Sequence, residues 1–512
     1  MRAAGFLVFV ALLASPAWGQ DAQLATGRVH GRAMADGSVI YDGVPYAEAP
    51  QGPLRWKAPV ARHPWGGTLE ATRPTPACPQ ADTGWNASFL ANSSEDCLTV
   101  SIRTPARQGE SLPVHFYSHG GSNAFAGAGD LSSDGLHREG IVVVKAQYRL
   151  GIFGFLGLDA LSAESPAHAS GNFALLDLIE ALHWVRANIR QFGGDPDNVT
   201  ISGNSAGGLN VLWLIMSPLA DGLYHKAIIQ AAAPGAPRTS AENAAVGDVF
   251  MGRLGLSADA AGLAALRQLP TATIIDAAQN LPVTPGTDPS FLFEQQILDG
   301  QVMSLAYDQA FARGAARGLP MLIGSNHQEL GTHYSDAAVP TLLESAFPHD
   351  TGRAAELYGV VHGRIPAPDP VLGSVATQIV TDMWFRCPVN WLSAHATANG
   401  AHVWRYEFGL GKFDSGKPPE HTSEMDYIYH SVPAAADARD WPPIQRYWAE
   451  FMRTGDPNNP NLPPWPAFGD QQVYLEILPE GLRVGRGARQ EICDKMFSEA
   501  PFPRSDIVPP TQ

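Results

Sequence analysis

One short segment combines a potential nucleophile with small neighbours. Residues 203–207 read Gly-Asn-Ser-Ala-Gly and fit the pattern G-x-S-x-G, in which a tight turn between a strand and a helix presents a serine hydroxyl to substrate. The β-branched run Val199–Ser202 precedes the turn, and the apolar run Asn210–Met216 follows it. The sequence therefore predicts a strand, a turn and a helix in the required order. A glycine-rich turn without a catalytic role has the same local pattern, so the context must decide.

A nucleophilic serine needs backbone N–H groups that stabilise the oxyanion of the reaction. His119-Gly120-Gly121 follows the predicted strand end VHFYS, and two glycines there allow N–H groups to face a tetrahedral oxygen. A third N–H would come from Ala206, the residue after the serine. Gly120, Gly121 and Ala206 are therefore the candidate oxyanion hole.

The serine also needs a base and an acid that orients the base. The chain has 16 histidines. Position after Ser205 admits several of them, and a place in a flexible loop after a late predicted strand favours His421. The alternatives that chain order leaves open are His333, His349, His362, His395, His402 and His430.

Short apolar runs alternate with helical segments along the chain. The predicted strands are Val114–Tyr117, Ile141–Val144, Val199–Ile201, Ala227–Gln230, Pro320–Ile323 and Val403–Phe408, and the clearest predicted helix is Leu175–Phe192. This alternation predicts a mainly parallel, doubly wound α/β sheet with helices on both faces. Ligands bind beyond the carboxyl ends of such strands, which is where Ser205 is expected.

Composition and the first residues restrict the class of protein. The 512 residues carry a formal net charge of −16 without a basic run, which argues against nucleic-acid binding. Arg2, the apolar run Ala3–Ala14 and Ala17-Trp18-Gly19 have the order of a Sec-type signal peptide, predicted over residues 1–19. A membrane anchor is the alternative, but the apolar run is short for a span, and no later run is long and apolar enough to cross a bilayer. We therefore expect an exported protein without stable membrane insertion.

The four cysteines fit an exported protein. Cys78, Cys97, Cys387 and Cys493 are an even number, which in an oxidising compartment indicates disulfides. Four cysteines allow three connectivities, and near neighbours favour Cys78–Cys97 and Cys387–Cys493. No Cys/His spacing is typical of a metal site.

Longer segments carry a resemblance to a known family. The markers are GVPYAEAPQGPLRW, SEDCLTVSI, QYRLGIFGFLG, GNFALLD, WVRANIRQFGGDPDNVTISGNSAGG and TGDPNNPNLPPWP. Together they span nearly the whole chain after the signal peptide, and they resemble the type-B carboxylesterases, which include para-nitrobenzyl esterases, lipases and cholinesterases. The resemblance implies one α/β-hydrolase domain over residues 20–512.

The resemblance also implies the partners of Ser205. The acid of the family lies in a G-x-N/T-x-D-E-G segment, and LIGSNHQELG places Glu329 there, with Gln328 and Leu330 in place of Asp and Gly. The base lies in an H-x-x-E segment, which is His421-Thr-Ser-Glu424. Asn204 stands where the cholinesterases carry Glu. In the oxyanion loop, Ser122-Asn123 replaces the usual glycine and aromatic residue.

Other positions match structural features of the family. The resemblance implies two buried ion pairs and the two disulfides named above; the ion pairs are Arg55–Glu95 and Arg149–Asp177. Aromatic side chains that could line the pocket are Trp85, Trp384 and Phe291–Phe293.

These observations predict an exported serine esterase that cleaves neutral or polar esters without a cofactor or metal. One alternative is a non-catalytic binding protein of the neuroligin type, which the intact Ser205, Glu329 and His421 disfavour. The other is a lipase with the Cys78–Cys97 loop as a lid, which the mainly polar composition of that loop disfavours.

Overall fold

The computed structural model describes residues 20–105, 109–279, 281, 293, 295–330, 334–413, 415–432 and 441–499. The predicted signal peptide at residues 1–19 lies outside the described residues, as do Phe291 and Leu292. None of the helices in the described part of the chain has the length and hydropathy that a membrane span requires.

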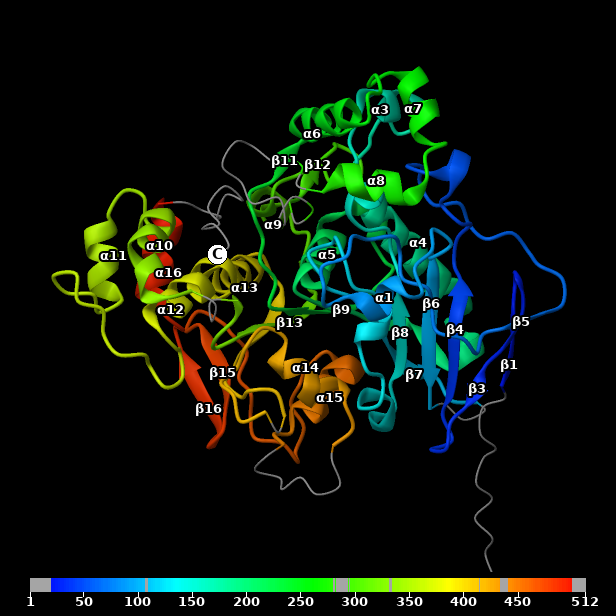
Figure 1. Cartoon of the computed structure of the whole chain (residues 1–512). Coiled ribbons are helices and arrows are strands. Elements are labelled where there is room, and N and C mark those ends of the chain that lie inside the picture. Colours follow the sequence, from blue (N-terminus) through cyan, green and yellow to red (C-terminus); the bar gives the residue numbers. More distant parts are fainter. Residues whose placement is uncertain are drawn as a thin grey trace, which may run out of the picture.

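A large, mainly parallel sheet crosses the molecule (Figure 1). Its eleven strands in the described residues are β3 (Arg32–Ala33), β4 (Val39–Pro45), β6 (Thr99–Thr104), β7 (Leu112–Ser118), β8 (Val142–Ala146), β9 (Gly194–Asn204), β10 (Lys226–Gln230), β13 (Pro320–Asn326), β14 (His402–Phe408), β15 (Val473–Leu478) and β16 (Gly481–Arg486). The spatial order is β16-β15-β14-β13-β10-β9-β7-β8-β6-β4-β3. The block from β15 to β8 is parallel, and the strands outside it pair antiparallel.

The register places several strand ends at one edge of the sheet. Ser118 of β7 pairs with Gly203 of β9, and Asn204 pairs with Gln230 of β10. Gln230 pairs in turn with Gly324 of β13, and that strand ends opposite Phe408 of β14. The loops that follow β7, β9, β13 and β14 therefore leave the sheet at the same edge.

Helices cover both faces of the sheet, and further helices lie outside these layers. They are α1 (Ala87–Leu90), α2 (Gly151–Phe155), α3 (Asp159–Glu164), α4 (Phe173–Asn188), α5 (Ala206–Met216), α6 (Ser240–Arg253), α7 (Ala260–Leu266), α8 (Thr271–Ala278), α9 (Tyr307–Ala312), α10 (Val339–Ala346), α11 (Thr351–Leu357), α12 (Val375–Thr381), α13 (Cys387–Ala398), α14 (Ser423–Tyr429), α15 (Ile444–Thr454) and α16 (Gln490–Glu499).

Alternation along the strands separates the two main cores. Ala227 and Ile229 of β10 pack into the core that includes α4, α5 and α13, whereas Ile228 between them packs into the core that includes α14 and α15. Because successive side chains of a strand point to opposite faces, this alternation shows that the sheet is covered on both sides. The predicted doubly wound α/β fold is therefore confirmed.

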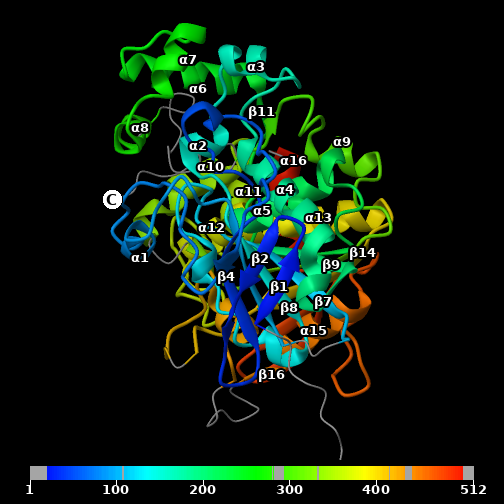
Figure 2. The same cartoon turned by 90° about the vertical axis from the view of Figure 1, so that its right-hand side faces the viewer.

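Two groups of helices lie outside these layers. Helices α6, α7 and α8 lie with α3 at the top of both views (Figures 1 and 2) and share a third apolar cluster. Helices α10, α11, α12 and α16 enclose a fourth cluster. Small elements complete the description: the three-stranded sheet β1 (Asp21–Leu24), β2 (Gly27–His30) and β5 (Thr68–Glu70), and the pair β11 (Arg238–Thr239) with β12 (Ile297–Leu298).

All six predicted strands exist, with ends that differ by a few residues. The largest difference is at β9, which begins at Gly194 and continues to Asn204. The predicted helix over Leu175–Phe192 is also present. Its main part is α4, which begins at Phe173, and a 3₁₀ helix at Ile189–Phe192 follows α4 directly.

Candidate active site

Ser205 occupies a strained turn between β9 and α5. Its φ of 59° and ψ of −128° are unusual for a residue with a side chain. The flanking glycines are required by close packing: a Cβ at Gly203 would lie 2.2 Å from the Gly207 carbonyl oxygen, and one at Gly207 would lie 2.1 Å from the Ser118 carbonyl oxygen. Glycines therefore let β9 and α5 meet at an angle that leaves the serine at the strand end.

The His-Gly-Gly segment lies directly beside this turn. A Cβ at Gly120 would lie 3.3 Å from the Ser205 Cβ, so the loop after β7 passes next to the serine. Gly121 has a φ of 94°, which glycine adopts without strain. Ala206 is the first residue of α5, and the first N–H groups of a helix have no partner within the helix. The three candidate oxyanion donors are thus brought together around Ser205.

Asn123 fastens the far side of the oxyanion loop. Its buried side chain accepts hydrogen bonds from Asn210 Nδ2 of α5 at 2.9 Å and from the Tyr148 hydroxyl at 3.1 Å, and it donates to the Phe293 carbonyl at 3.0 Å. Its φ of 53° is in the left-handed region, which asparagine tolerates better than most residues. Asn123, which differs from the usual residue at this position, therefore provides polar contacts between the oxyanion loop and α5, the helix that follows Ser205.

His119 supports the loop as a neutral residue. Its ring stacks on Tyr148 with centroids 4.4 Å apart, and the Tyr148 hydroxyl donates to the His119 carbonyl at 2.7 Å. Burial lowers the pKa of His119 to about 4. At neutral pH it adds no charge beside Ser205.

The loops after β13 and β14 bring Glu329 and His421 together. His421 Nδ1 lies 2.5 Å from Glu329 Oε2. The Asn326 backbone N–H donates to Glu329 Oε1 at 2.6 Å, and the Thr381 hydroxyl accepts the Glu329 N–H at 3.1 Å. A carboxylate that is buried and held on both sides can fix the orientation and tautomer of an imidazole.

The altered residues around Glu329 keep it in place. Gln328 Nε2 donates to the Val371 carbonyl at 2.9 Å, which ties the turn to a neighbouring loop. Leu330 is 38% exposed. The two departures from the usual segment are therefore compatible with contact between Glu329 and His421.

Glu424, three residues after His421, is a second buried acid at the site. Its Oε1 accepts from Asn204 Nδ2 at 3.0 Å, and its Oε2 accepts from Asn326 Nδ2 at 2.8 Å. Burial and the nearby carboxylate of Glu329 raise the pKa of Glu424 to about 7.

A short π-helix buttresses the histidine. It spans Asp382–Arg386, between α12 and α13, and the ring of its Phe385 lies 5.1 Å from the ring of His421. Arg386 Nη2 donates to the His327 carbonyl, in the turn before Glu329, at 2.9 Å. Insertions of this kind are frequent at functional sites.

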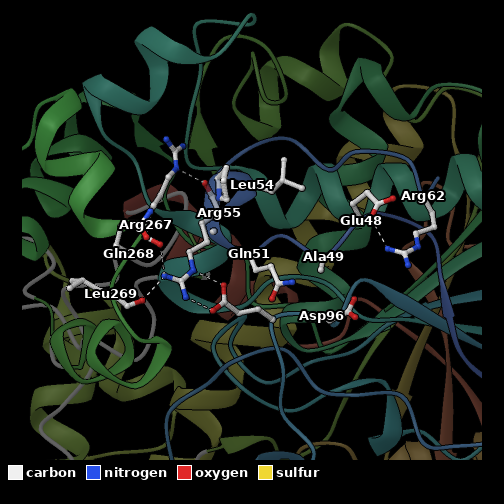
Figure 3. A pocket seen from close by; sticks show the side chains of 13 residues that line it. Glu48, Ala49, Gln51, Leu54, Arg55, Arg62, Asp96, Arg267, Gln268 and Leu269 are labelled. Carbon is white, nitrogen blue, oxygen red and sulfur yellow. Dashed lines mark hydrogen bonds and ion pairs between the residues drawn. The ribbon is translucent and has the colours of Figure 1, made fainter.

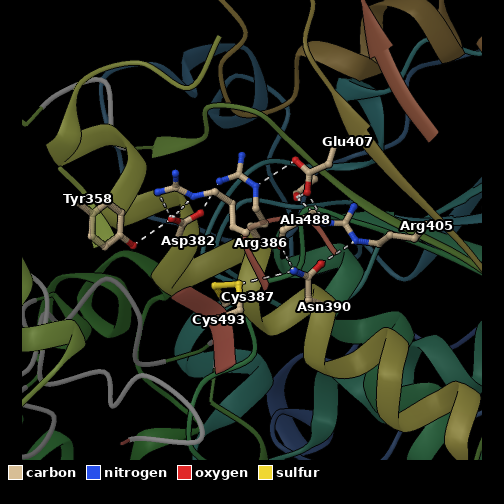
Figure 4. Close-up of a disulfide and its surroundings, with 11 residues drawn as sticks. Tyr358, Asp382, Arg386, Cys387, Asn390, Arg405, Glu407, Ala488 and Cys493 are labelled. Atoms are coloured by element: carbon tan, nitrogen blue, oxygen red, sulfur yellow. Dashed lines mark hydrogen bonds and ion pairs between the residues drawn. A yellow bond between two sulfur atoms is a disulfide. The ribbon is translucent and has the colours of Figure 1, made fainter. Parts of the chain in front are cut away.

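Directly after this π-helix, the Cys387–Cys493 disulfide joins the first residue of α13 to α16 (Figure 4). Beside it, Arg386 binds Asp382 and Glu407, and Arg489 donates to Asp382 at 3.0 Å. Figure 4 shows Arg386 between Asp382 and Glu407. The C-terminal helix is thus bound to the segment that contacts His421.

Comparisons with known proteins identify a family whose model matches nearly the whole chain. The model of the Carboxylesterase family matches residues 20–351 and 371–496. The chain belongs to this family. It is a carboxylic ester hydrolase with the α/β-hydrolase fold.

Individual relatives support the family assignment. The para-nitrobenzyl esterase of Bacillus subtilis (strain 168) is 32% identical over 498 residues, which cover 92% of this chain and 97% of that protein. The fumonisin B1 esterase of Sphingopyxis macrogoltabida is 33% identical over 475 residues, which cover 87% and 84%. A solved structure of PNB esterase matches with a TM-score of 0.78 at 28% identity, covering 93% of this chain and 99% of that one.

The scaffold pairs expected in a carboxylesterase are present. Arg149 and Asp177 are fully buried, and Arg149 Nε donates to Asp177 Oδ2 at 2.7 Å. The second disulfide joins Cys78 to Cys97. Arg55 Nε donates to Glu95 Oε2 at 2.7 Å.

The Arg55–Glu95 pair borders a charged pocket of about 660 Å³ (Figure 3). Arg62 binds Glu48 on the other side of this pocket at 2.6 Å. Since Ser205, Glu329 and His421 do not line it, this pocket is separate from the candidate active site.

The three aromatic positions expected near the pocket differ in exposure. Trp85 is 58% exposed, and its ring meets Phe125 of the oxyanion loop edge to face at 5.3 Å. Trp384 is buried in the cluster of α10, α12 and α16. Phe293 packs against Phe155 at 5.9 Å, and residues 291–292 lie outside the described part of the chain.

Sequence reasoning missed several contacts of the site. It did not identify Asn326, Thr381 or Phe385, because each acts through a contact with a residue distant in the sequence. The Glu of the H-x-x-E segment was visible as Glu424, but its contact with Asn204 joins positions 220 residues apart.

Proposed function

We propose that this carboxylesterase is an exported serine hydrolase in which Ser205 attacks the ester carbonyl and His421 takes its proton. Glu329 holds the imidazole in the required tautomer and stabilises its charge. The N–H groups of Gly120, Gly121 and Ala206 stabilise the oxyanion. The alcohol leaves with the proton from His421, and water, activated by the same histidine, hydrolyses the acyl-enzyme.

One observation carries this proposal. The contact between His421 and the buried Glu329 lies at the sheet edge where the strained Ser205 turn and the His-Gly-Gly loop also lie. A non-catalytic binding protein has no need of a buried acid–histidine contact beside a strained serine, so we place that alternative second.

We also propose that residues 1–19 are removed on export and that residues 20–512 act as one catalytic domain. The two disulfides support an oxidising destination, because such bonds persist outside the reducing cytosol. Detection of the mature N-terminus in the exported fraction tests the processing step.

The substrates proposed are neutral or polar carboxylic esters. The names of the relatives suggest a first panel: a para-nitrobenzyl ester, fumonisin B1, short-chain chromogenic esters and an emulsified long-chain ester. A lipase requires preference for the emulsified substrate. The polar composition of the Cys78–Cys97 loop instead supports preference for short or polar esters.

The decisive experiment combines substitution with covalent labelling. Ser205→Ala is expected to lower kcat by about 10⁴–10⁶-fold while the protein stays folded. An organophosphonate should label the wild-type protein at Ser205 only, as read by peptide mass spectrometry. Labelling at another residue, or turnover in Ser205→Ala close to that of the wild type, rejects the proposal.

A further inference from the structure

Three amide side chains surround the buried carboxyl group of Glu424. Asn204 Nδ2 and Gln230 Nε2 donate to its Oε1 at 3.0 and 3.4 Å, and Asn326 Nδ2 donates to its Oε2 at 2.8 Å. Among the described residues, the hydrogen-bond donors to this side chain are all neutral. A buried carboxylate without a contacting Lys or Arg destabilises the folded protein. We therefore looked for a function of Glu424 in the reaction.

These amides connect Glu424 to both turns of the candidate triad. Asn204 is the residue before Ser205, and Asn326 Nδ2 also donates to Glu329 Oε1 at 3.2 Å. Glu424 itself lies in the first turn of α14, three residues after His421. The Glu424 carboxyl group is therefore linked to all three parts of the proposed triad. It is linked to the nucleophile through Asn204 and to the acid through Asn326, and it lies on the same segment as the base.

The other ionisable groups that face Glu424 are few. Glu329 lies across Asn326, and His421 precedes it on the same segment. Tyr406 of β14 and Tyr429 of α14 are fully buried. Burial, followed by the charge of Glu424, raises the pKa of Tyr406 well above its ordinary value. Burial also raises the pKa of Tyr429. Both tyrosines therefore stay neutral, so within the described part of the chain the charge that faces Glu424 comes from Glu329 and His421.

We propose that Asn204 and Glu424 form a positioning pair: the amide holds the carboxyl between the two turns, and the ionised carboxyl stabilises the imidazolium that His421 becomes as Ser205 attacks. This inference rests on the proposed triad. Glu424 transfers no proton in the reaction; the serine proton moves to His421 and then to the leaving alcohol. An anion beside Glu329 is unfavourable in the resting site and favourable once the imidazolium forms.

Glu424→Gln tests the charge with little change of shape. The matched control is Glu420→Gln, one residue before His421, because the Glu420 side chain is 45% exposed and pairs with Lys412 at 3.1 Å. We expect Glu424→Gln to lower kcat about tenfold and to move the acid limb of the kcat/KM profile by about 0.5–1 pH unit to lower pH. KM for a neutral ester should change less than about twofold, and Glu420→Gln should match the wild type.

Asn204→Asp tests the pair from the opposite side. It adds a second acid against Glu424, so we expect the acid limb to move to higher pH. We expect kcat to fall because the amide that holds the Glu424 carboxyl is lost. The double variant N204D/E424Q exchanges the positions of acid and amide and restores one donor and one acceptor. It should recover most of the kcat lost in the worse single variant, which is the behaviour of a coupled pair.

All rates are expressed per active site, counted by phosphonate labelling of Ser205. Opposite shifts of the acid limb in the two single variants, with recovery in the double variant, support the pair. An unshifted profile in either single variant, or a double variant no more active than the worse single one, overturns it. Should Glu424→Gln fail to fold, the profile of Asn204→Asp still decides. Absence of label at Ser205 in an active wild-type protein rejects the triad itself, whereas labelled protein with unshifted profiles rejects only the pair.

Discussion

His421 Nδ1 and Glu329 Oε2 lie 2.5 Å apart at the ends of two neighbouring parallel strands, although 92 residues separate them in the sequence. The carboxylate accepts from the backbone of Asn326 on its other oxygen, so it cannot turn away from the histidine without losing that bond. In the proposed mechanism, Nε2 of the same ring takes the serine proton.

Glu329→Gln should lower kcat by about 10³–10⁴-fold, because an amide provides no charge for the imidazolium and can favour the wrong tautomer. The loss should be smaller than in Ser205→Ala. Steady-state kinetics with a chromogenic short-chain ester measures it, and phosphonate labelling of Ser205 should slow in parallel. Near-wild-type activity in Glu329→Gln would show that another acid orients the base.

His421→Ala should be almost as damaging as Ser205→Ala, because it removes the group proposed to take the serine proton. His402→Ala and His430→Ala are matched controls: His402 is exposed at the start of β14, and the His430 side chain is 53% exposed. Both controls should keep the kcat of the wild type. Loss of activity in a control, together with an active His421→Ala, would move the base to that histidine.

The sequence was sufficient where local pattern and strand order determine position. The β-branched end of β9 and the glycines around Ser205 predicted the elbow, since only glycine fits at 203 and 207. The family resemblance gave Glu329 and His421, and the parallel pairing of β13 and β14 explains why the loops that carry them meet at one edge of the sheet.

The contacts that the sequence did not predict come from segments with no fixed register to the sheet. Thr381 reaches Glu329 from the end of α12, and Phe385 of the π-helix lies against His421. The third and fourth apolar clusters likewise consist of short helices whose packing is decided by tertiary contacts, not by their own periodicity.

Removal of the Cys387–Cys493 disulfide should lower both stability and activity. This bond closes a loop of 106 residues, and Cys78–Cys97 closes one of 19, so the chain-entropy model gives about 4–5 and about 3 kcal/mol. C387S/C493S should therefore lower Tm more than C78S/C97S, and it should also lower kcat through the segment that contacts His421. Thermal unfolding and kcat on the two variants measure this. Equal kcat in both would separate the disulfide from the site.

Glu424 should make stability depend on pH in a defined direction. Burial and the charge of Glu329 raise its folded-state pKa from 4.5 to about 7, so the folded protein holds this proton more tightly than the unfolded chain. The wild type therefore loses stability as pH rises from 4.5 to 7. Glu424→Gln has no carboxyl at this position, so its free energy of unfolding does not contain this loss.

The free energy of unfolding of Glu424→Gln, minus that of the wild type, should accordingly increase by up to about 3 kcal/mol between pH 4.5 and 8. Denaturant titrations at the two pH values measure the difference, with Glu420→Gln as the control that stays flat. A difference independent of pH in Glu424→Gln would mean that the carboxyl titrates near its ordinary value.

Choline esters should be no better substrates than uncharged esters of the same shape. Asn204 is neutral, and its side chain is buried and donates to Glu424, so the residue before Ser205 presents no carboxylate to substrate. A negative charge about 5 Å from a cation attracts it by about 1–3 kcal/mol at an effective dielectric constant of 80–20, and this attraction is missing here. The measurement is the ratio of kcat/KM for a choline ester to that for its uncharged isostere, which we expect to be about one or lower.

Asn204→Glu should raise the ratio if the introduced carboxylate reaches the substrate. A strong preference of the wild type for the choline ester would point to a cation site elsewhere. The exposed ring of Trp85, which meets Phe125 at the edge of the oxyanion loop, would then be tested by Trp85→Ala, because aromatic faces bind quaternary ammonium groups.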